Sequence, residues 1–169
     1  MDKALVVDNH GMNPYVKGGL EGIGYNVSHI GMASDAIKIL RESIKPQLVI
    51  SDVNVTNPYN GISFVRDARV VVPYSRIFLW SGKFGSGEDY SPGSIDHSFK
   101  ALLMAGTIDG YSHKSPDKAL AGRTMVDLVL ADEFEHFARK YGIIMDIAGV
   151  EGLFRILNSS PKTVNVEMH

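Results

Sequence analysis

Cysteine is absent from the 169 residues of this chain. Its absence excludes disulfide bonds and thiolate-ligated metal sites, and it fits a reducing compartment. An excess of positive charge is also missing, because 17 Lys and Arg residues stand against 19 Asp and Glu residues and leave a formal net charge of -2. The bulk charge therefore gives no indication of a nucleic-acid-binding surface.

Long hydrophobic runs are absent as well. The N-terminal sequence MDKALVVDNHG has an apolar run far too short for a signal peptide, and no run elsewhere approaches the length of a membrane span. Hydrophobic residues nonetheless make up 44% of the chain, which is typical of a globular protein with a core and not of a disordered chain. We therefore expect a cytoplasmic protein built from one domain, or from one domain and an appendage.

Short apolar runs alternate with amphipathic segments up to about residue 118. Such runs, apolar on both faces, are typical of strands in a parallel sheet covered by helices on each side. Asn13 and Ser34 are placed to cap the first two of the helices between them. A strand–helix unit repeated five times predicts an open parallel sheet with helices on both faces. The predicted strands are residues 4–7, 25–30, 48–51, 77–80 and 109–114.

Polar side chains of a reactive type follow four of these strands. Asp8 follows the first strand, Asp52 the third and Ser81 the fourth, and Lys114 stands at the very end of the fifth. Taken singly, a strand-end Asp or Ser usually caps a turn and a Lys usually extends to solvent. Because the carboxyl ends of parallel strands open on one crevice, however, the four side chains should meet there. Carboxylates, a hydroxyl and an ammonium in one place predict a magnesium–phosphate site.

The segments ALVVDN, LVISDVNVTNPYNG, IFLWSG and AGTIDGYSHK, in this order and spacing, carry a family resemblance. Together they resemble the receiver domain of two-component response regulators, the CheY-like superfamily, over about residues 3–118. The resemblance implies a flavodoxin-like, doubly wound α/β fold whose five parallel strands have the order 2-1-3-4-5. It places the receiver domain at residues 1–122.

The resemblance also implies a role for individual residues. Asp52 would be the phosphoacceptor, taking a phosphoryl group from a sensor histidine kinase, a phosphotransfer protein or a small phosphodonor. Ser81 would hydrogen-bond the phosphoryl group, and Lys114 would pair with its charge. Tyr111 and Ser81 would form the switch whose side-chain conformations change on phosphorylation and are recognised by a downstream protein partner. Such a domain has no catalytic output of its own. The implied Mg2+ ligands are Asp8, Asn9, Asp52 and the backbone carbonyl of Asn54.

Two departures from the family pattern leave alternatives open. Asn9 stands where the family usually has a second acidic residue, and Ser115 separates Lys114 from Pro116. A degenerate pseudo-receiver that binds a partner without phosphorylation is therefore the chief alternative. DVNVT is also similar to the nucleophile loop of haloacid-dehalogenase-like phosphatases, but Asn54 replaces the aspartate that transfers the proton in those enzymes. The phosphatase is thus a remote alternative.

Residues 123–169 are expected to form a helical C-terminal extension. A long helix is predicted from Pro116 to Tyr141, a second one from Met145, and a frayed tail from Asn158. The segment from Gly142 onward has two basic residues against three acidic ones, so direct DNA binding is not expected. Packing on the receiver, homodimerisation and partner docking all remain open. The apolar stripe that supports them consists of Val126, Leu130, Phe134, Phe137, Tyr141, Ile147, Val150, Phe154 and Leu157.

Overall fold

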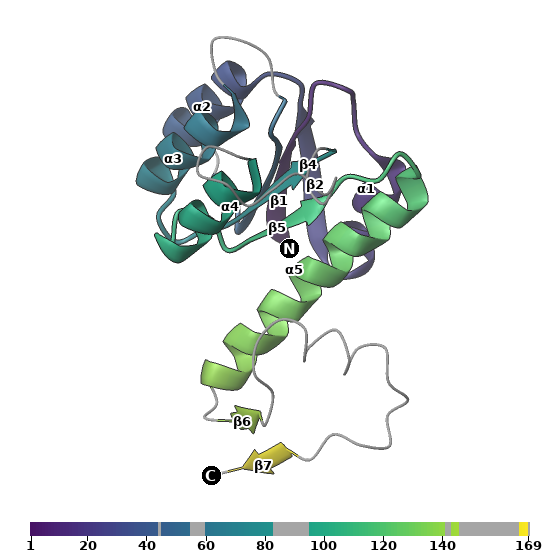
Figure 1. Cartoon of the computed structure of the whole chain (residues 1–169), viewed down its shortest axis with the longest axis vertical. Coiled ribbons are helices and arrows are strands. Elements are labelled where there is room, and N and C mark those ends of the chain that lie inside the picture. Colours follow the sequence, from purple (N-terminus) through teal and green to yellow (C-terminus); the bar gives the residue numbers. More distant parts are fainter. Residues whose placement is uncertain (44, 55–59, 83–94, 141–142, 146–165, 169) are drawn as a thin grey trace. The chain divides into compact units, whose positions relative to one another are not determined.

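The computed structural model describes residues 1–43, 45–54, 60–82, 95–140, 143–145 and 166–168 (Figure 1). The chain divides into two compact units, Met1–Met125 and Val126–His169. Among the described residues, no helix combines the length and the apolar character that crossing a membrane requires.

The first unit contains a five-stranded parallel sheet with the order β2-β1-β3-β4-β5. This order and the helices between the strands confirm the predicted flavodoxin-like α/β fold. Each residue of β3 is buried, because β3 is the central strand and helices cover both of its faces. The strands are β1 (Asp2–Val7), β2 (Tyr25–Ile30), β3 (Leu48–Asp52), β4 (Arg76–Ser81) and β5 (Gly110–His113).

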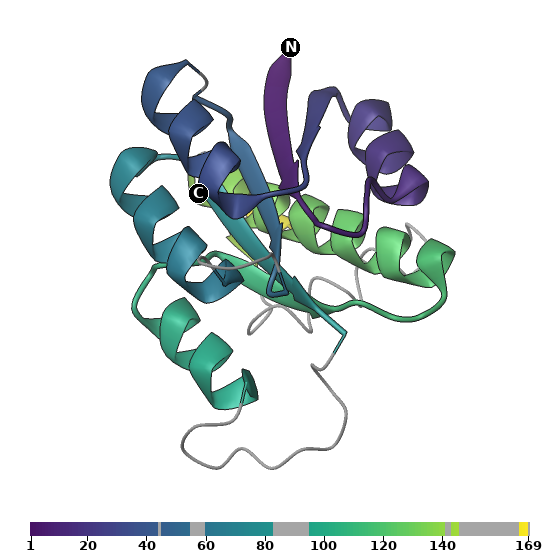
Figure 2. The same ribbon diagram turned by 90° about the horizontal axis from the view of Figure 1, so that it is seen from above.

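The helices form one layer on each face of the sheet (Figures 1 and 2). Helices α2 (Ala33–Glu42), α3 (Gly61–Val71) and α4 (Ile95–Met104) cover one face. Helix α1 (Pro14–Gly22) and the start of α5 (Lys118–Lys140) cover the other. The main core lies between the sheet and the first of these layers. It includes Leu5, Val7, Val49, Ile77, Leu79, Ile37, Leu40, Phe64 and Phe99.

Asn13 caps α1, as predicted, and also joins it to α5. Its side-chain oxygen accepts hydrogen bonds from the backbone N–H groups of Tyr15 (2.9 Å) and Val16 (3.3 Å). Its side-chain nitrogen donates to the carbonyl of Lys118, 3.0 Å away. A Cβ on Gly122 would lie 2.5 Å from the Cβ of Tyr15, so α1 and α5 approach closely at this glycine. These contacts fix the helices that flank the carboxyl ends of β1 and β5.

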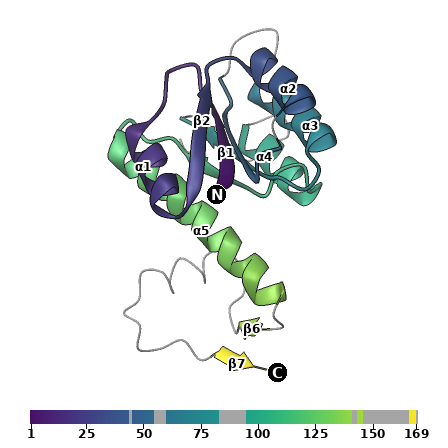
Figure 3. The same cartoon turned by 180° about the vertical axis from the view of Figure 1, so that it is seen from behind.

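The prediction that Ser34 caps α2 is wrong. The N-cap position lies two residues earlier, at Met32, whose side chain makes no capping hydrogen bond, and the helix begins at Ala33. Ala33 is fully buried, so packing extends the helix beyond the residue whose side chain favoured a cap. Seen from behind, α2 and α3 lie side by side (Figure 3).

The second unit begins within α5 and includes a pair of short antiparallel strands, β6 (Ile143–Met145) and β7 (Val166–Met168). Met145, predicted to begin a helix, instead ends β6, and part of the predicted frayed tail forms β7. Pairing between residues far apart in sequence is not visible in a local helical pattern. Within the predicted apolar stripe, Val126 is buried and Leu130 and Phe134 are half-buried. The side chains of the stripe from Phe137 onward lie outside the described residues.

Substitution of Gly61 tests how closely α3 approaches the carboxyl end of β3. A Cβ at Gly61 would overlap the carbonyl oxygen of Asp52 and lie 2.7 Å from the Cα of Val53. Gly61→Ala should therefore lower the free energy of unfolding by about 1–3 kcal/mol, because backbone atoms must shift to relieve the overlap. Urea unfolding followed by circular dichroism measures the change.

Gly18 in α1 supplies the matched control, because a Cβ there would meet no atom within 4 Å. Gly18→Ala should leave stability unchanged or raise it by up to about 1 kcal/mol, since alanine is the better helix former. If Gly61→Ala proved as harmless as Gly18→Ala, the close approach of α3 to the end of β3 would be refuted.

Candidate functional site

Two buried carboxylates lie side by side at the carboxyl ends of β1 and β3. Asp8 and Asp52 are each only 2% exposed. Val7 pairs with Ser51 in the sheet register, so the residues that follow them are neighbours. Burying two carboxylates together is unfavourable unless a cation or hydrogen-bond donors compensate them.

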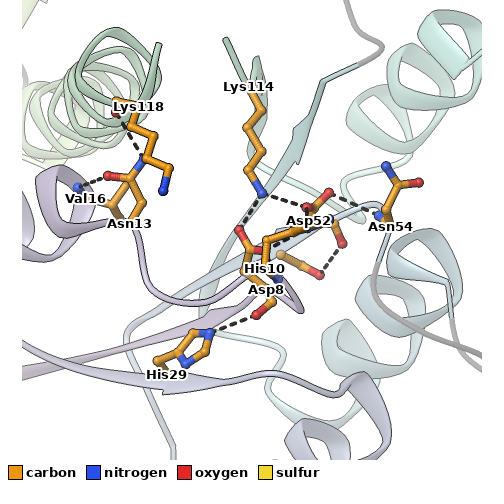
Figure 4. Close-up of polar contacts among 10 residues, drawn as sticks. Asp8, His10, Asn13, Val16, His29, Asp52, Asn54, Lys114 and Lys118 are labelled. Atoms are coloured by element: carbon orange, nitrogen blue, oxygen red, sulfur yellow. Dashed lines mark hydrogen bonds and ion pairs between the residues drawn. The ribbon is translucent and has the colours of Figure 1, made fainter. Parts of the chain in front are cut away.

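The ammonium group of Lys114 supplies this compensation (Figure 4). Its Nζ donates to Oδ2 of Asp8 at 2.6 Å and to Oδ2 of Asp52 at 2.7 Å. The backbone N–H of Lys114 donates to the carbonyl of Ser81 at 2.8 Å, which anchors the residue just past β5. Three of the four predicted side chains therefore meet through direct contacts, as the positions of the strand ends predict.

The pKa of Lys114 lies above its ordinary value. Burial alone would lower this pKa, but the hydrogen bonds and charges of Asp52 and Asp8 outweigh burial and raise it. The lysine therefore carries its positive charge throughout the physiological pH range. Formally, one positive charge faces two carboxylates, so the cluster can take up further positive charge.

Backbone groups hold the remaining carboxylate oxygens. Oδ1 of Asp52 accepts a hydrogen bond from the N–H of Asn54 at 3.1 Å, and Oδ1 of Asp8 accepts one from the N–H of His10 at 2.9 Å. Each bond links an aspartate to the residue two positions later, which is the geometry of an Asx turn. Nε2 of His29 lies 2.8 Å from the carbonyl oxygen of Asp8. Both carboxylates are thus oriented by the turns that follow their strands.

His10 belongs to the site although the sequence argument did not include it. Its Nδ1 lies 3.5 Å from Oδ1 of Asp8 and 3.7 Å from Oδ2 of Asp52. Potential ligand atoms of Asp8, His10 and Asp52 all lie within 4.8 Å of one another. The available signal was the Asp-x-His spacing after a strand, because an Asx turn brings the third residue back over the aspartate. Asn9, between them, is exposed.

The other predicted site residues lie on β4 and β5. Ser81 is fully buried at the end of β4, where it pairs with His113 in the sheet register. Tyr111 is half-buried, and its ring centroid lies 5.4 Å from that of Phe99 in α4. Tyr111 thus packs on the helix that follows Ser81 in the chain.

Trp80 was not predicted to touch the cluster. The Nζ of Lys114 lies 5.0 Å from the centroid of its ring, within the range of a cation–π interaction. Trp80 is fully buried and pairs with Asp52 in the register of β3 and β4. The lone tryptophan of the chain therefore adjoins the charged cluster and can report changes in it.

The donor set of the site suits a divalent cation and a phosphoryl group. Carboxylate oxygens are the ligands that Mg2+ prefers, and Asp8 and Asp52 present two such groups together. An ammonium group such as that of Lys114 pairs with phosphoryl oxygens. The residues present therefore fit the magnesium site implied by the family resemblance.

Removing the ammonium of Lys114 tests whether it stabilises the buried pair. Lys114→Met keeps most of the aliphatic chain but leaves the carboxylates without this cation. We expect the free energy of unfolding at about pH 8 to fall by about 1–3 kcal/mol, less than for a fully buried pair, because 22% of the lysine side chain is exposed.

The pH dependence of this difference follows from the raised pKa of Lys114. The stabilisation should be fully present below the unfolded-state pKa of about 10.4, and it should decline as the pH rises through the higher folded-state pKa. Urea unfolding of both proteins at a series of pH values measures it. A difference that grew at alkaline pH would contradict this assignment.

Comparisons with known proteins agree on the fold. No protein-family model and no curated protein sequence matches this chain. Among solved structures, a response regulator receiver domain protein from Clostridium thermocellum is 19% identical with a TM-score of 0.58, and 81% of this chain covers 98% of it.

Two further solved structures give the same result. A CheY-like receiver domain protein from Methanospirillum hungatei is 16% identical with a TM-score of 0.57, and 80% of this chain covers 98% of it. The chemotaxis response regulator CheY4 of Vibrio cholerae is 21% identical with a TM-score of 0.53, and 75% of this chain covers 98% of it. This chain therefore has the fold of a response regulator receiver domain.

Proposed function

We propose that this chain is a receiver domain that accepts a phosphoryl group on Asp52 and signals through a protein partner. The observation that carries the proposal is the position of the Asp52 carboxylate. It lies at the end of the central strand, beside the Asp8 carboxylate and 2.7 Å from the Lys114 ammonium. This arrangement combines a nucleophile, a cation site and a partner for phosphoryl oxygens.

The reaction is the transfer of a phosphoryl group to a carboxylate. A carboxylate oxygen of Asp52 attacks phosphorus, and a new O–P bond forms as the bond from phosphorus to the leaving group breaks. With phosphohistidine the imidazole nitrogen retains the electron pair of the broken N–P bond, and with acetyl phosphate the departing acetate does. The product is an acyl phosphate on Asp52, and nothing is oxidised or reduced.

Residues around Asp52 stabilise the charge of the transferred group. Mg2+, when bound, supplies positive charge to phosphoryl oxygens, and Asp8, Asn9, Asp52 and the carbonyl of Asn54 would hold it. Lys114 is already within hydrogen-bond distance of Asp52, so its ammonium can pair with a phosphoryl group there. Ser81 donates a hydrogen bond to the same group from the end of the neighbouring strand.

The signal leaves the site through Ser81, Tyr111 and α4. Tyr111 packs against Phe99 of α4, so a change in its side-chain conformation changes the surface that α4 and β5 present. A sensor histidine kinase or phosphotransfer protein supplies the phosphoryl group, and a downstream protein reads the surface. The chain has no catalytic output of its own in this proposal.

One observation favours the pseudo-receiver alternative. Lys114 donates to both carboxylates at once, so the protein's own ammonium compensates part of the charge of the buried pair. A fold stable in this state can bind a partner without being phosphorylated. Competence for phosphorylation separates the two functions.

Phosphorylation of the whole chain with acetyl phosphate and Mg2+ tests the proposal. Wild type should gain the mass of one phosphoryl group in intact-protein mass spectrometry, and Asp52→Asn should gain none, because an amide is not a nucleophile for this transfer. Asp2→Asn is the matched control, since Asp2 is an exposed aspartate at the start of β1. Equal labelling of wild type and Asp52→Asn would rule out Asp52 as the acceptor.

Asn9 is expected to weaken Mg2+ binding relative to a carboxylate at the same position. Asn9→Asp adds a negative charge beside Asp8 and should tighten Mg2+ binding several-fold. Fluorescence of Trp80 measures the titration, because its ring lies 5.0 Å from the Lys114 ammonium. Unchanged or weaker affinity would show that the side chain of residue 9 does not serve the cation.

A further inference from the structure

We infer that His10 is a ligand of the cation site and that the site consequently prefers an imidazole-binding transition-metal ion, such as Co2+ or Zn2+, to Mg2+. The inference concerns the same site as the proposed function and rests on it for the use of the cation. Metal binding can nevertheless be measured without any phosphodonor, so the two can fail separately.

The position of His10 supports this role. Its Nδ1 faces a carboxylate oxygen of each aspartate, at 3.5 Å from Asp8 and 3.7 Å from Asp52. Its backbone N–H is hydrogen-bonded to Asp8, which fixes the main chain beside the cluster. Its side chain is 68% exposed, so the imidazole can adjust to a metal ion with little repacking. The exposure also leaves an approach for the ion from solvent.

The ligand chemistry determines the preference. Carboxylate and carbonyl oxygens suit Mg2+, whereas an imidazole nitrogen suits Co2+, Ni2+ and Zn2+. Two carboxylates and one imidazole therefore form a mixed oxygen–nitrogen set. An amide at position 9 adds no charge that would favour a hard cation. A histidine among the ligands thus changes the kind of metal ion that binds, and not only the strength of binding.

Lys114 competes with the metal ion for the same carboxylates. Its Nζ is hydrogen-bonded to Oδ2 of Asp8 and to Oδ2 of Asp52, while Oδ1 of Asp8 faces His10. A metal ion held by both aspartates must weaken at least one bond of the lysine. Removal of the ammonium should therefore strengthen the binding of every divalent cation, whereas removal of the imidazole should affect transition-metal ions selectively.

Isothermal titration calorimetry of the full, untagged chain with CoCl2 and with MgCl2 tests the inference. Wild type should bind Co2+ more tightly than Mg2+. His10→Ala should weaken Co2+ binding by at least about tenfold, because a metal ligand is lost, and should change Mg2+ binding far less. The visible absorption spectrum of bound Co2+ should also differ between wild type and His10→Ala. A purely structural role of His10 would not change that spectrum.

Three further variants sharpen the result. His136→Ala removes an exposed histidine of α5 outside the cluster and should leave both affinities unchanged. His10→Asp replaces the imidazole by a carboxylate and should move the preference toward Mg2+. Lys114→Met should tighten the binding of both ions. Circular dichroism of each variant verifies that it is folded.

The inference is overturned if wild type does not prefer Co2+, or if His10→Ala weakens both ions equally or neither. If the selectivity for Co2+ over Mg2+ depends on His10 but Asp52 gains no phosphoryl group, the inference about His10 stands and only the proposed function fails. Conversely, labelling of Asp52 together with an unselective His10→Ala variant would leave the proposed function intact and remove His10 from the ligands.

Discussion

The hydrogen bonds from Lys114 to Asp8 and Asp52 are the interaction on which the candidate site depends. They join residues 106 and 62 positions apart and hold the ends of β1, β3 and β5 to one charged centre. The carboxylates can stay together in a buried position because this ammonium compensates them. The same ammonium lies close enough to Asp52 to pair with the negative charge of a phosphoryl group there. Stability of the cluster and its proposed chemistry therefore use the same contacts.

The amino ends and the carboxyl ends of the strands differ in their polar contacts. At the amino ends of β4 and β5, Arg69 donates to the carbonyls of Thr107, Pro73 and Ser75 and pairs with Asp109, which also accepts from the N–H of Ile77. That network links α3 to the strands through one guanidinium and many backbone partners. At the carboxyl ends of β1, β3 and β5, one ammonium faces two carboxylates, so the charges there are uneven. Binding and phosphoryl transfer are expected at the edge whose charges are incompletely compensated.

The sequence predicted the sheet, its order and the meeting of three strand-end side chains, because strand polarity alone brings Asp8, Asp52 and Lys114 to one edge. It did not identify His10 or the ring of Trp80. The position of the His10 side chain depends on an Asx turn. The position of the Trp80 ring depends on which face of β4 the side chain occupies. Ser34 and Met145 were assigned from local patterns, and packing and long-range pairing overrode both. The functional roles of the site residues stay predictions: Asp8, Asn9, Asp52, Asn54, Ser81, Tyr111 and Lys114.

The central claim is that Asp52 carries a phosphoryl group as an acyl phosphate. Peptide mapping by mass spectrometry after exposure to acetyl phosphate and Mg2+, with and without hydroxylamine, tests it most directly. The account predicts the added mass on the peptide that contains Asp52 and its loss in hydroxylamine, which cleaves acyl phosphates. A label on another peptide, a label that survives hydroxylamine, or no label at all would contradict it.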